Sequence, residues 1–202
     1  MTQLGDRTCL ITGASSGLGA HFARTLSGAG ARVVLAARRL DRVQALAEEI
    51  RATGGEALPV ALNVSDEKSV VSAFDAAEQA FGIVDTIIAN AGVSAPGRST
   101  EISAESMRSV LDTNVMGVLL TAREGARRMI VAGSRDNGRG RIVLIGSITA
   151  EMTGQGETIY SASKAAAAAH LATIALEWRR FKIKTTDARP GHTETGLAGR
   201  AI

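Results

Sequence analysis

Residues 7–19 read RTCLITGASSGLG, and this stretch decides the fold of the chain. The apolar run at its start predicts a short buried strand over residues 7–12. The glycines that follow, Gly13, Gly17 and Gly19, mark a tight turn that leads into a helix ending near Gly28. A strand, a glycine-rich turn and a helix in immediate succession form the opening unit of an α/β sheet.

The rest of the chain repeats this alternation of strand and helix. The expected strands lie at residues 32–37, 57–62, 83–89, 141–146 and 182–188, and the expected helices at residues 40–53, 66–81, 103–115, 117–132 and 158–180. Residues 133–140 read as a surface loop. Strands that alternate with helices predict a doubly wound parallel sheet with helices on both faces. The expected fold class is therefore α/β, Rossmann-like, with about six strands in a single domain over residues 1–202.

Composition argues against several classes of function. Apolar residues make up 45% of the chain and aromatic residues 3%, so we expect an aliphatic core and no aromatic platform for single-stranded nucleic acid. The three histidines lie far apart and leave no pattern of metal ligands. The single cysteine, Cys9, reads as a small core residue of a protein in the reducing cytoplasm. No apolar run has the length of a membrane span or of a signal peptide.

A second stretch, YSASK at residues 160–164, predicts chemistry. Its tyrosine and lysine are four residues apart and share one side of a helix. One charge at ~4 Å and an effective dielectric of ~20 contributes about 4 kcal/mol, so Lys164 could lower the pKa of Tyr160 by up to about three units. Tyr160 would then serve as a general acid or base, and Ser147, after the strand at residues 141–146, could bind a substrate oxygen. Alone, the pair better fits an exposed tyrosine and lysine on an amphipathic helix.

The glycine cluster and the end of the second strand together point to a dinucleotide site. Glycines let the backbone approach a pyrophosphate, whose charge a helix N-terminus stabilises. Their spacing, Gly13-x-x-x-Gly17-x-Gly19, differs from the usual G-x-G-x-x-G, and an ordinary turn explains it equally well. The second strand ends at Arg38 and Arg39 without the acidic residue that favours NAD. A guanidinium there can pair with a 2′-phosphate, which favours NADP, although a solvated basic pair is the alternative.

Further groups fall where parallel strands are expected to end. They are Asn90-Ala91-Gly92 after the fourth strand, Asn114 in the helical region that follows, and Pro190-Gly191 with Thr195 after the sixth strand. Each is weak evidence alone, because asparagine and glycine often mark turns. Their order is stronger evidence, because open α/β sheets bind ligands at the carboxyl ends of their strands. Residues 94–102 and 149–158 are expected to line the substrate end of the same site.

Taken in order, these motifs resemble the short-chain dehydrogenase/reductase family, in the group that includes 3-oxoacyl carrier-protein reductases. The resemblance spans nearly the whole chain. It implies that Tyr160 gives or takes the substrate proton, that Lys164 lowers the pKa of Tyr160 and binds the nicotinamide ribose, and that Ser147 holds the substrate oxygen. It also implies that Asn114 holds a water molecule linking Lys164 to bulk solvent. The cofactor supplies the hydride.

The expected cofactor is NADP(H), given the arginines at the end of the second strand, and no metal is expected. The implied cofactor-binding residues are Gly13, Ser15, Ser16, Gly17, Leu18, Gly19, Arg38, Arg39, Asn63, Val64, Asn90, Ala91, Gly92, Tyr160, Lys164, Pro190, Gly191 and Thr195. The glycines would shape the pyrophosphate turn, Asn90 would support the cofactor side of the sheet, and Thr195 would contact the carboxamide. The implied partners are a small carbonyl or alcohol substrate and a second copy of the chain, held through the long helices after the fourth and fifth strands.

Several features depart from the family pattern. Asn63 stands where an aspartate usually contacts the adenine amino group, and its amide oxygen can still accept that hydrogen bond, though more weakly. Ala89 replaces a common asparagine before Asn90. The sixth strand is unusually polar for a buried strand. The final strand of the family has no counterpart, so we expect the sixth strand to lie at a sheet edge. A dimer is therefore better supported than a tetramer.

Three functional hypotheses follow. The leading one is an NADP(H)-dependent oxidoreductase that transfers hydride between nicotinamide and a ketone or secondary alcohol, with carbonyl reduction as the favoured direction. One alternative is a 3-oxoacyl-thioester reductase whose basic surface residues dock an acidic carrier protein. The other is a cofactor-binding module with little catalysis, which the shortened C-terminus favours and the intact Ser147, Tyr160 and Lys164 set opposes.

Overall fold

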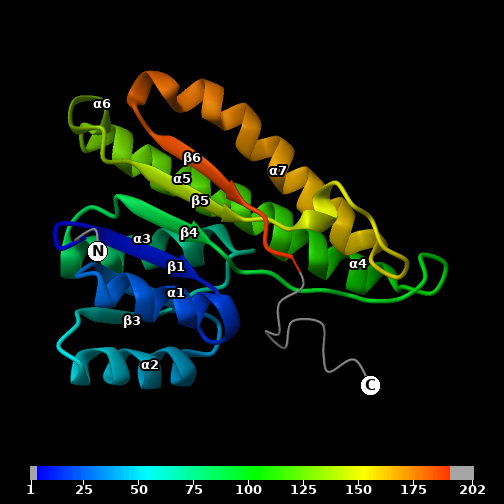
Figure 1. Ribbon diagram of the computed structural model, residues 1–202, viewed down its shortest axis with the longest axis horizontal. Coiled ribbons are helices and arrows are strands. Elements are labelled where there is room, and N and C mark those ends of the chain that lie inside the picture. Colours follow the sequence, from blue (N-terminus) through cyan, green and yellow to red (C-terminus); the bar gives the residue numbers. More distant parts are fainter. Residues whose placement is uncertain (1–3, 192–202) are drawn as a thin grey trace.

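One parallel sheet runs through the computed structural model, which describes residues 4–191 (Figure 1). Its strands are β1 Thr8–Thr12, β2 Arg32–Ala37, β3 Ala57–Ala61, β4 Thr86–Ala89, β5 Arg141–Ile145 and β6 Lys184–Ala188. They lie in the order β3-β2-β1-β4-β5-β6, and every neighbouring pair is parallel. The order reverses between β1 and β4, which is where open α/β sheets form a ligand crevice. The predicted doubly wound parallel sheet is confirmed.

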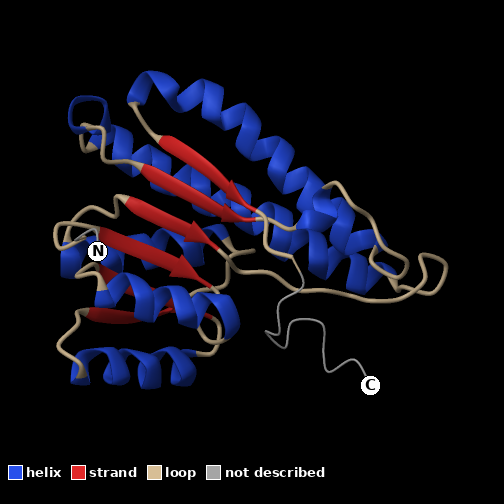
Figure 2. Ribbon diagram, viewed as in Figure 1, coloured by secondary structure: helices blue, strands red, loops and turns tan. Residues whose placement is uncertain are grey.

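Helices cover both faces of this sheet (Figure 2). The helical elements are α1 Gly17–Gly28, α2 Leu40–Ala52, α3 Glu67–Phe81, α4 Ala104–Leu111, the π-helix η1 Asp112–Met116, α5 Gly117–Val131, α6 Ser134–Asn137, the 3₁₀ turn η2 Ile148–Ala150, α7 Thr158–Trp178 and the 3₁₀ turn η3 Arg179–Phe181. Ile11 of β1 packs with α1 and α2 on one face, whereas its neighbour Leu10 packs with α3, α5 and α7 on the other. Every residue of β1 is therefore buried, as expected for a central parallel strand.

The two edge strands match their sequences. β3 forms one edge and contains Pro59, which cannot donate a backbone hydrogen bond to a neighbour. β6 forms the other edge of the described sheet, where it pairs with β5. None of the residues of β6 is fully buried, which explains the polar Thr185, Thr186 and Asp187. The prediction that the sixth strand lies at an edge holds for residues 4–191.

Local signals predict most element ends, with some corrections. Asp66 caps α3 through a hydrogen bond that its carboxylate accepts from the Lys68 amide, at 3.0 Å. The fourth strand begins at Thr86 rather than Ile83. Ile83 is 41% exposed, and the Asp85 carboxylate forms ion pairs with Arg7 and Arg139. The expected loop at residues 133–140 contains the short helix α6, and the helix expected at residues 103–115 divides into α4 and η1. Among residues 4–191, no helix combines the length and apolar character needed to span a bilayer.

Candidate functional site

A cavity of about 1060 Å³ opens at the carboxyl ends of the strands. It is lined by these residues expected from the sequence: Gly13, Ser15, Ser16, Gly17, Leu18, Arg38, Arg39, Asn63, Val64, Asn90, Ala91, Gly92, Ser147, Tyr160, Lys164, Pro190 and Gly191. Gly19 and Asn114 are not among the lining residues, and both are buried next to residues that line the cavity. Thr195 lies outside the described residues. The structure thus gathers segments that are far apart in the sequence around one space.

The turn after β1 requires glycine for two separate reasons. Gly13 has a φ of +68°, which L side chains rarely adopt, and a Cβ there would lie 2.9 Å from the Cα of Ala91. A Cβ on Gly19 would lie 2.4 Å from the carbonyl oxygen of Gly13, so this glycine lets α1 pack tightly against the turn. Ser16, at the N-cap of α1, makes no side-chain capping bond. The first-turn amides of α1 are therefore not capped by that side chain and can receive an anion.

Two arginines follow β2 at the same end of the cavity. The guanidinium of Arg39 donates hydrogen bonds to the hydroxyls of Ser15 at 3.0 Å and Ser16 at 3.1 Å. Arg38 is exposed and also lines the cavity. The side-chain oxygen of Asn63 accepts a hydrogen bond from the Ser65 amide at 3.2 Å and so stabilises the turn at residues 63–65. This end of the cavity combines positive charge with hydroxyl groups.

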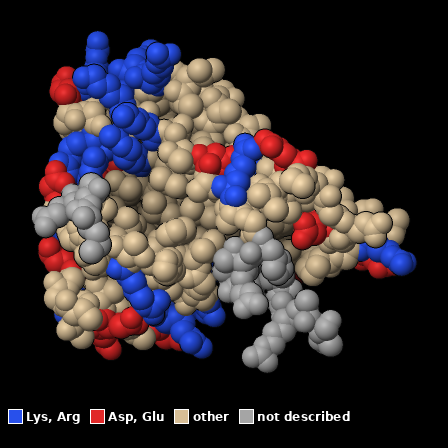
Figure 3. Space-filling model, viewed as in Figure 1, with Lys and Arg blue, Asp and Glu red and all other residues tan. Residues whose placement is uncertain are grey.

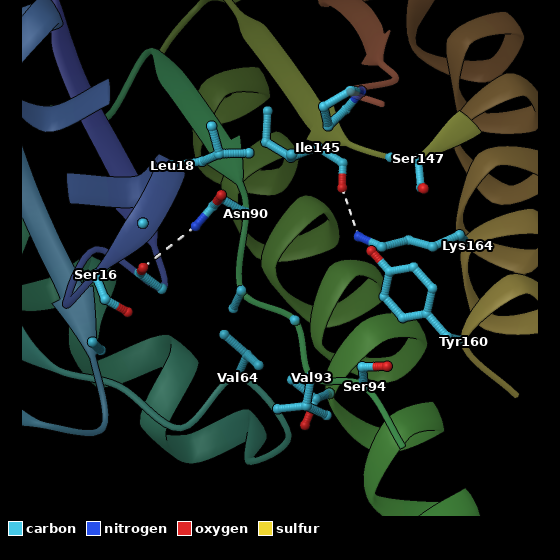
Figure 4. Close-up of a pocket in the computed structure, with 18 of the residues that line it drawn as sticks. Ser16, Leu18, Val64, Asn90, Val93, Ser94, Ile145, Ser147, Tyr160 and Lys164 are labelled. Atoms are coloured by element: carbon cyan, nitrogen blue, oxygen red, sulfur yellow. Dashed lines mark hydrogen bonds between the residues drawn. The ribbon is translucent and has the colours of Figure 1, made fainter. Parts of the chain in front are cut away.

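Thr12 and Asn90 tie the end of β4 to the end of β1. The side-chain amide of Asn90 donates to the carbonyl oxygen of Thr12 at 2.9 Å and to that of Gly13 at 3.3 Å. The Thr12 hydroxyl accepts from the main-chain amides of Asn90 at 3.0 Å and Ala91 at 2.9 Å. Figure 4 shows the Asn90 side chain directed at the glycine-rich turn. The supporting position expected for Asn90 agrees with this geometry.

Asn114 sits in η1 and is 1% exposed. Its side-chain oxygen accepts from the Val93 amide at 2.8 Å, and its side-chain nitrogen donates to the Val93 carbonyl at 2.9 Å. The same nitrogen donates to the Ser163 hydroxyl at 3.0 Å, and that hydroxyl donates to the main-chain oxygen of Tyr160 at 2.7 Å. Asn114 therefore joins the segment after β4 to α7. Sequence reasoning missed Ser163, because a buried hydroxyl partner has no local signature.

Ser147, Tyr160 and Lys164 converge at the other end of the cavity (Figure 4). The Nζ of Lys164 donates a 2.7 Å hydrogen bond to the Ile145 carbonyl and lies 5.6 Å from the centroid of the Tyr160 ring. Ser147 is the N-cap of η2, and its hydroxyl oxygen accepts hydrogen bonds from the amide of Thr149 at 3.2 Å and from the Thr149 hydroxyl at 2.9 Å. The strand end and the first turns of α7 thus fix three groups suited to proton transfer.

The pKa of Tyr160 was expected to be lowered, and this prediction is wrong. Burial raises the pKa of Tyr160 above its ordinary value; the Ser147 hydroxyl acts in the opposite direction, and the Glu157 carboxylate adds to the rise. Burial also disfavours the charged form of Lys164 and lowers its pKa to about 8, and the Asp187 carboxylate partly offsets this lowering. The sequence argument counted the attraction between a lysine and a phenolate but could not include the cost of burying both groups.

Residues 7–201 match the family described as short chain dehydrogenase. The chain belongs to this family. An uncharacterised oxidoreductase from Myxococcus xanthus is 32% identical over 197 residues, which cover 98% of this chain and 76% of that protein. These matches make the chain an oxidoreductase of the short chain dehydrogenase family, which uses nicotinamide cofactors.

Solved structures of other short chain dehydrogenases share the fold. An alcohol dehydrogenase from the archaeon Thermococcus sibiricus, complexed with 5-hydroxy-NADP, is 29% identical with a TM-score of 0.88, over 96% of this chain and 79% of that chain. A short chain dehydrogenase/reductase from Burkholderia phymatum, in complex with NAD, is 31% identical with a TM-score of 0.91, over 98% of this chain and 70% of that chain. Because these two hold different nucleotides, likeness to them does not decide between NAD and NADP.

In this short chain dehydrogenase the two ends of the cavity differ in charge. Arg38 and Arg39 lie at the end next to β2, whereas Glu157 lines the cavity together with Tyr160. Ser94 and Thr149 also line it, as expected for the segments at residues 94–102 and 149–158. Among residues 4–191, no cluster of histidine, cysteine, aspartate and glutamate could hold a metal ion.

Proposed function

We propose that the chain is an NADP(H)-dependent oxidoreductase that transfers hydride between nicotinamide and a ketone or secondary alcohol. The observation that carries this proposal is that Ser147, Tyr160 and Lys164 line the same cavity as Arg38 and Arg39. One end of the cavity therefore offers groups for proton transfer, and the other offers groups for a phosphorylated nucleotide. Carbonyl reduction is the proposed direction.

The residues present fit a dinucleotide. Uncapped amides at the start of α1 and the hydroxyls of Ser15 and Ser16 suit the pyrophosphate. Arg39, which already bonds both hydroxyls, is placed to bring positive charge to the same phosphates or to a 2′-phosphate. NADPH, when bound, supplies the hydride. The glycine turn, Asn63, Val64 and the Asn90–Gly92 segment would hold the rest of the nucleotide.

The preference for NADP over NAD rests on the end of β2. In short chain dehydrogenases and related folds, an acidic side chain at this place hydrogen-bonds the adenosine ribose of NAD. This chain has Ala37 followed by Arg38 and Arg39. Two guanidinium groups would form charged hydrogen bonds with a 2′-phosphate, which a ribose hydroxyl cannot match.

The proposed proton path starts at Tyr160, whose hydroxyl would donate its proton to the substrate oxygen during reduction. Ser147 would hold that oxygen, and its hydroxyl already helps to stabilise the ionised form of Tyr160. Lys164 would bind the nicotinamide ribose and support the phenolate that remains. Asn114 would position the wall behind Lys164, and Pro190, Gly191 and Thr195 would border the nicotinamide.

The distribution of basic side chains favours a free ketone over a carrier-bound thioester. One group of exposed basic residues lies at the amino end of the sheet, around α6, η3 and the start of β6 (Figure 3). They are Arg135, Arg179, Arg180, Lys182 and Lys184. The cavity opens at the carboxyl ends of the strands, so this basic surface would hold an acidic carrier protein away from Tyr160.

The proposed partner is a second copy of the chain. We also propose that the enzyme is cytoplasmic and consists of a single domain. The exposed residues of α7 from Ala162 to Leu176 are mainly alanines, and none of them is charged. Leu176 is 76% exposed, and Met116 at the end of η1 is 45% exposed. An uncharged helix face of this length fits a second helix pair packed against it. The proposed assembly is a homodimer.

The proposal is tested by fluorescence titration of the chain with NADPH and with NADH, followed by turnover of a ketone panel. Saturable binding that favours NADPH, together with ketone-dependent oxidation of NADPH, is the expected result. Tight binding of NADPH without oxidation by any ketone would support the alternative of a cofactor-binding module. Failure of the folded chain to bind either nucleotide would contradict the proposal.

A further inference from the structure

We infer that Glu157 selects substrates by charge: the catalytic end of the cavity takes ketones or secondary alcohols that carry a cationic group, and it disfavours those that carry a carboxylate or phosphate. This inference rests on the proposed function, because it assigns a substrate class to the same site. It depends on one carboxylate that has no ion-pair partner within the described part of the chain.

Glu157 immediately precedes α7 and lies three residues before Tyr160. It is half-buried and lines the cavity. Its main-chain oxygen accepts the Ser161 amide at 2.8 Å, which fixes the residue to the first turn of the helix. Its carboxylate has no hydrogen-bond or ion-pair partner among residues 4–191.

The other carboxylates near this end are neutralised. Glu151 pairs with Arg189, which also pairs with Asp187 at 2.5 Å. Glu101 lies 3.6 Å from Arg98, and neither residue lines the cavity. Glu157 therefore differs from the neighbouring acidic residues in being both unpaired and inside the cavity.

The positively charged side chains that line the cavity form no ion pair with the Glu157 carboxylate. Among the described lining residues, Arg38 and Arg39 follow β2 at the nucleotide end. Lys164 is 5% exposed, and its ammonium is bonded to the Ile145 carbonyl. The remaining side chains around Ser147 are uncharged, including Ile148 and Thr149. Among the lining residues that the structure describes, Glu157 is therefore the one half-buried carboxylate that an incoming substrate can contact, whereas the positive charge of Lys164 is buried.

The size of the effect follows from Coulomb's law. A substrate charge roughly 8 Å from a carboxylate, in a partly solvated cleft, changes binding by about tenfold, with opposite sign for a cation and an anion. The charge of Glu157 has little effect on the binding of a neutral substrate. The selectivity between matched cationic and anionic ketones is then roughly a hundredfold.

The same carboxylate also acts on the proton transfer. When Tyr160 donates its proton, the hydroxyl O–H bond of the tyrosine breaks, the O–H bond of the alcohol forms, and a phenolate remains. Glu157 disfavours that phenolate, because its carboxylate helps to raise the pKa of Tyr160. A cationic group bound beside Glu157 offsets this field. Cationic substrates should therefore show a higher kcat as well as a lower KM.

The test uses the full chain and three methyl ketones that carry a quaternary ammonium, a hydroxyl or a carboxylate at the same distance from the carbonyl. The expected order of kcat/KM for the unaltered protein is ammonium, then hydroxyl, then carboxylate. Glu157→Gln should reduce the ratio of ammonium to carboxylate by roughly a hundredfold, and Glu157→Lys should invert it. Glu101→Gln is the matched control, outside the cavity, and should leave the ratio unchanged.

Binding of the same ketones to the NADPH complex, measured by calorimetry, separates this inference from the proposed function. If no ketone is reduced but the affinities keep the order ammonium over carboxylate and lose it in Glu157→Gln, the proposed function fails and the inference stands. If the ketones are reduced but the ratio is the same in Glu157→Gln, the inference fails and the proposed function stands. Preference for the carboxylate, or failure to bind any of the three, also overturns the inference.

Discussion

The side-chain amide of Asn114 donates a 3.0 Å hydrogen bond to the hydroxyl of Ser163, a residue 49 positions further along the chain. This contact joins η1 to α7 directly beside Lys164. Asn114 also satisfies both main-chain groups of Val93, so three segments of the cavity wall meet at one buried side chain. The π-helix at η1 places that side chain inward, in keeping with the tendency of π-bulges to occur at functional sites.

Two buried serines on α7 provide a matched test of this contact. Ser163→Ala removes the hydroxyl that accepts from Asn114, and we expect the free energy of unfolding to fall by about 1 to 2 kcal/mol. Ser161→Ala removes a buried hydroxyl that has no partner in the structure, so it should be neutral or slightly stabilising. Urea denaturation of both variants measures the difference. Equal losses in the two variants would show that the contact with Asn114 contributes little.

Asp187 should set the pH range of activity through Lys164. Its carboxylate raises the pKa of Lys164, which burial brings down to about 8. Because a protonated Lys164 is needed beside Tyr160, activity should fall as the pH rises through about 8. Asp187→Asn removes the charge, so the pKa of Lys164 drops further and the fall begins at lower pH. The pH profile of kcat/KM checks this against Asp136→Asn in α6, and an unmoved profile would contradict it.

The end of β2 should decide the nucleotide. Replacing Ala37 with Asp and Arg38 with Ala supplies an acceptor for a ribose hydroxyl and removes one partner of a 2′-phosphate. We expect the ratio of kcat/KM for NADPH over NADH to fall by roughly tenfold to a hundredfold, the range of a lost charge-assisted hydrogen bond. Arg42→Ala, an exposed arginine of α2 outside the cavity, is the control. An unchanged ratio would remove the role given to Arg38.

The outer face of α7 should hold the second copy of the chain. Ala169→Glu places a charge in the middle of the exposed apolar face, which would be buried in a dimer without a partner. Light scattering should show a dimer for the unaltered protein and a monomer for the variant, with the fold retained. Ala52→Glu, an exposed alanine at the end of α2, should stay dimeric. A monomeric unaltered protein would contradict the proposed assembly.

Much of the fold could be predicted because it depends on local pattern. The apolar run of β2 gives the predicted bounds of residues 32–37, and β6 lies at an edge of the described sheet, as expected. The spacing of Tyr160 and Lys164 likewise placed both side chains on one side of α7, lining one cavity. These features need only the period of a helix or strand and the chemistry of single residues.

Other features depend on contacts that no local pattern contains. The direction of the Tyr160 pKa shift was predicted wrongly, because burial raises that pKa and the Glu157 carboxylate adds to the rise. Ser163 gained its role from a partner in η1, and the helix α6 formed within eight residues that read as a turn-rich loop. Glu157 was placed only within a lining segment, because its lack of a partner becomes visible after folding.

The measurement that tests the central claim most directly is NADPH oxidation by Tyr160→Phe with a ketone that the unaltered protein reduces. If Tyr160 supplies the proton, kcat should fall by a factor of about a hundred or more, while NADPH still binds with an affinity within about threefold of the unaltered protein. Retention of full turnover by this variant, with normal NADPH binding, would contradict the assignment of Tyr160 as the general acid.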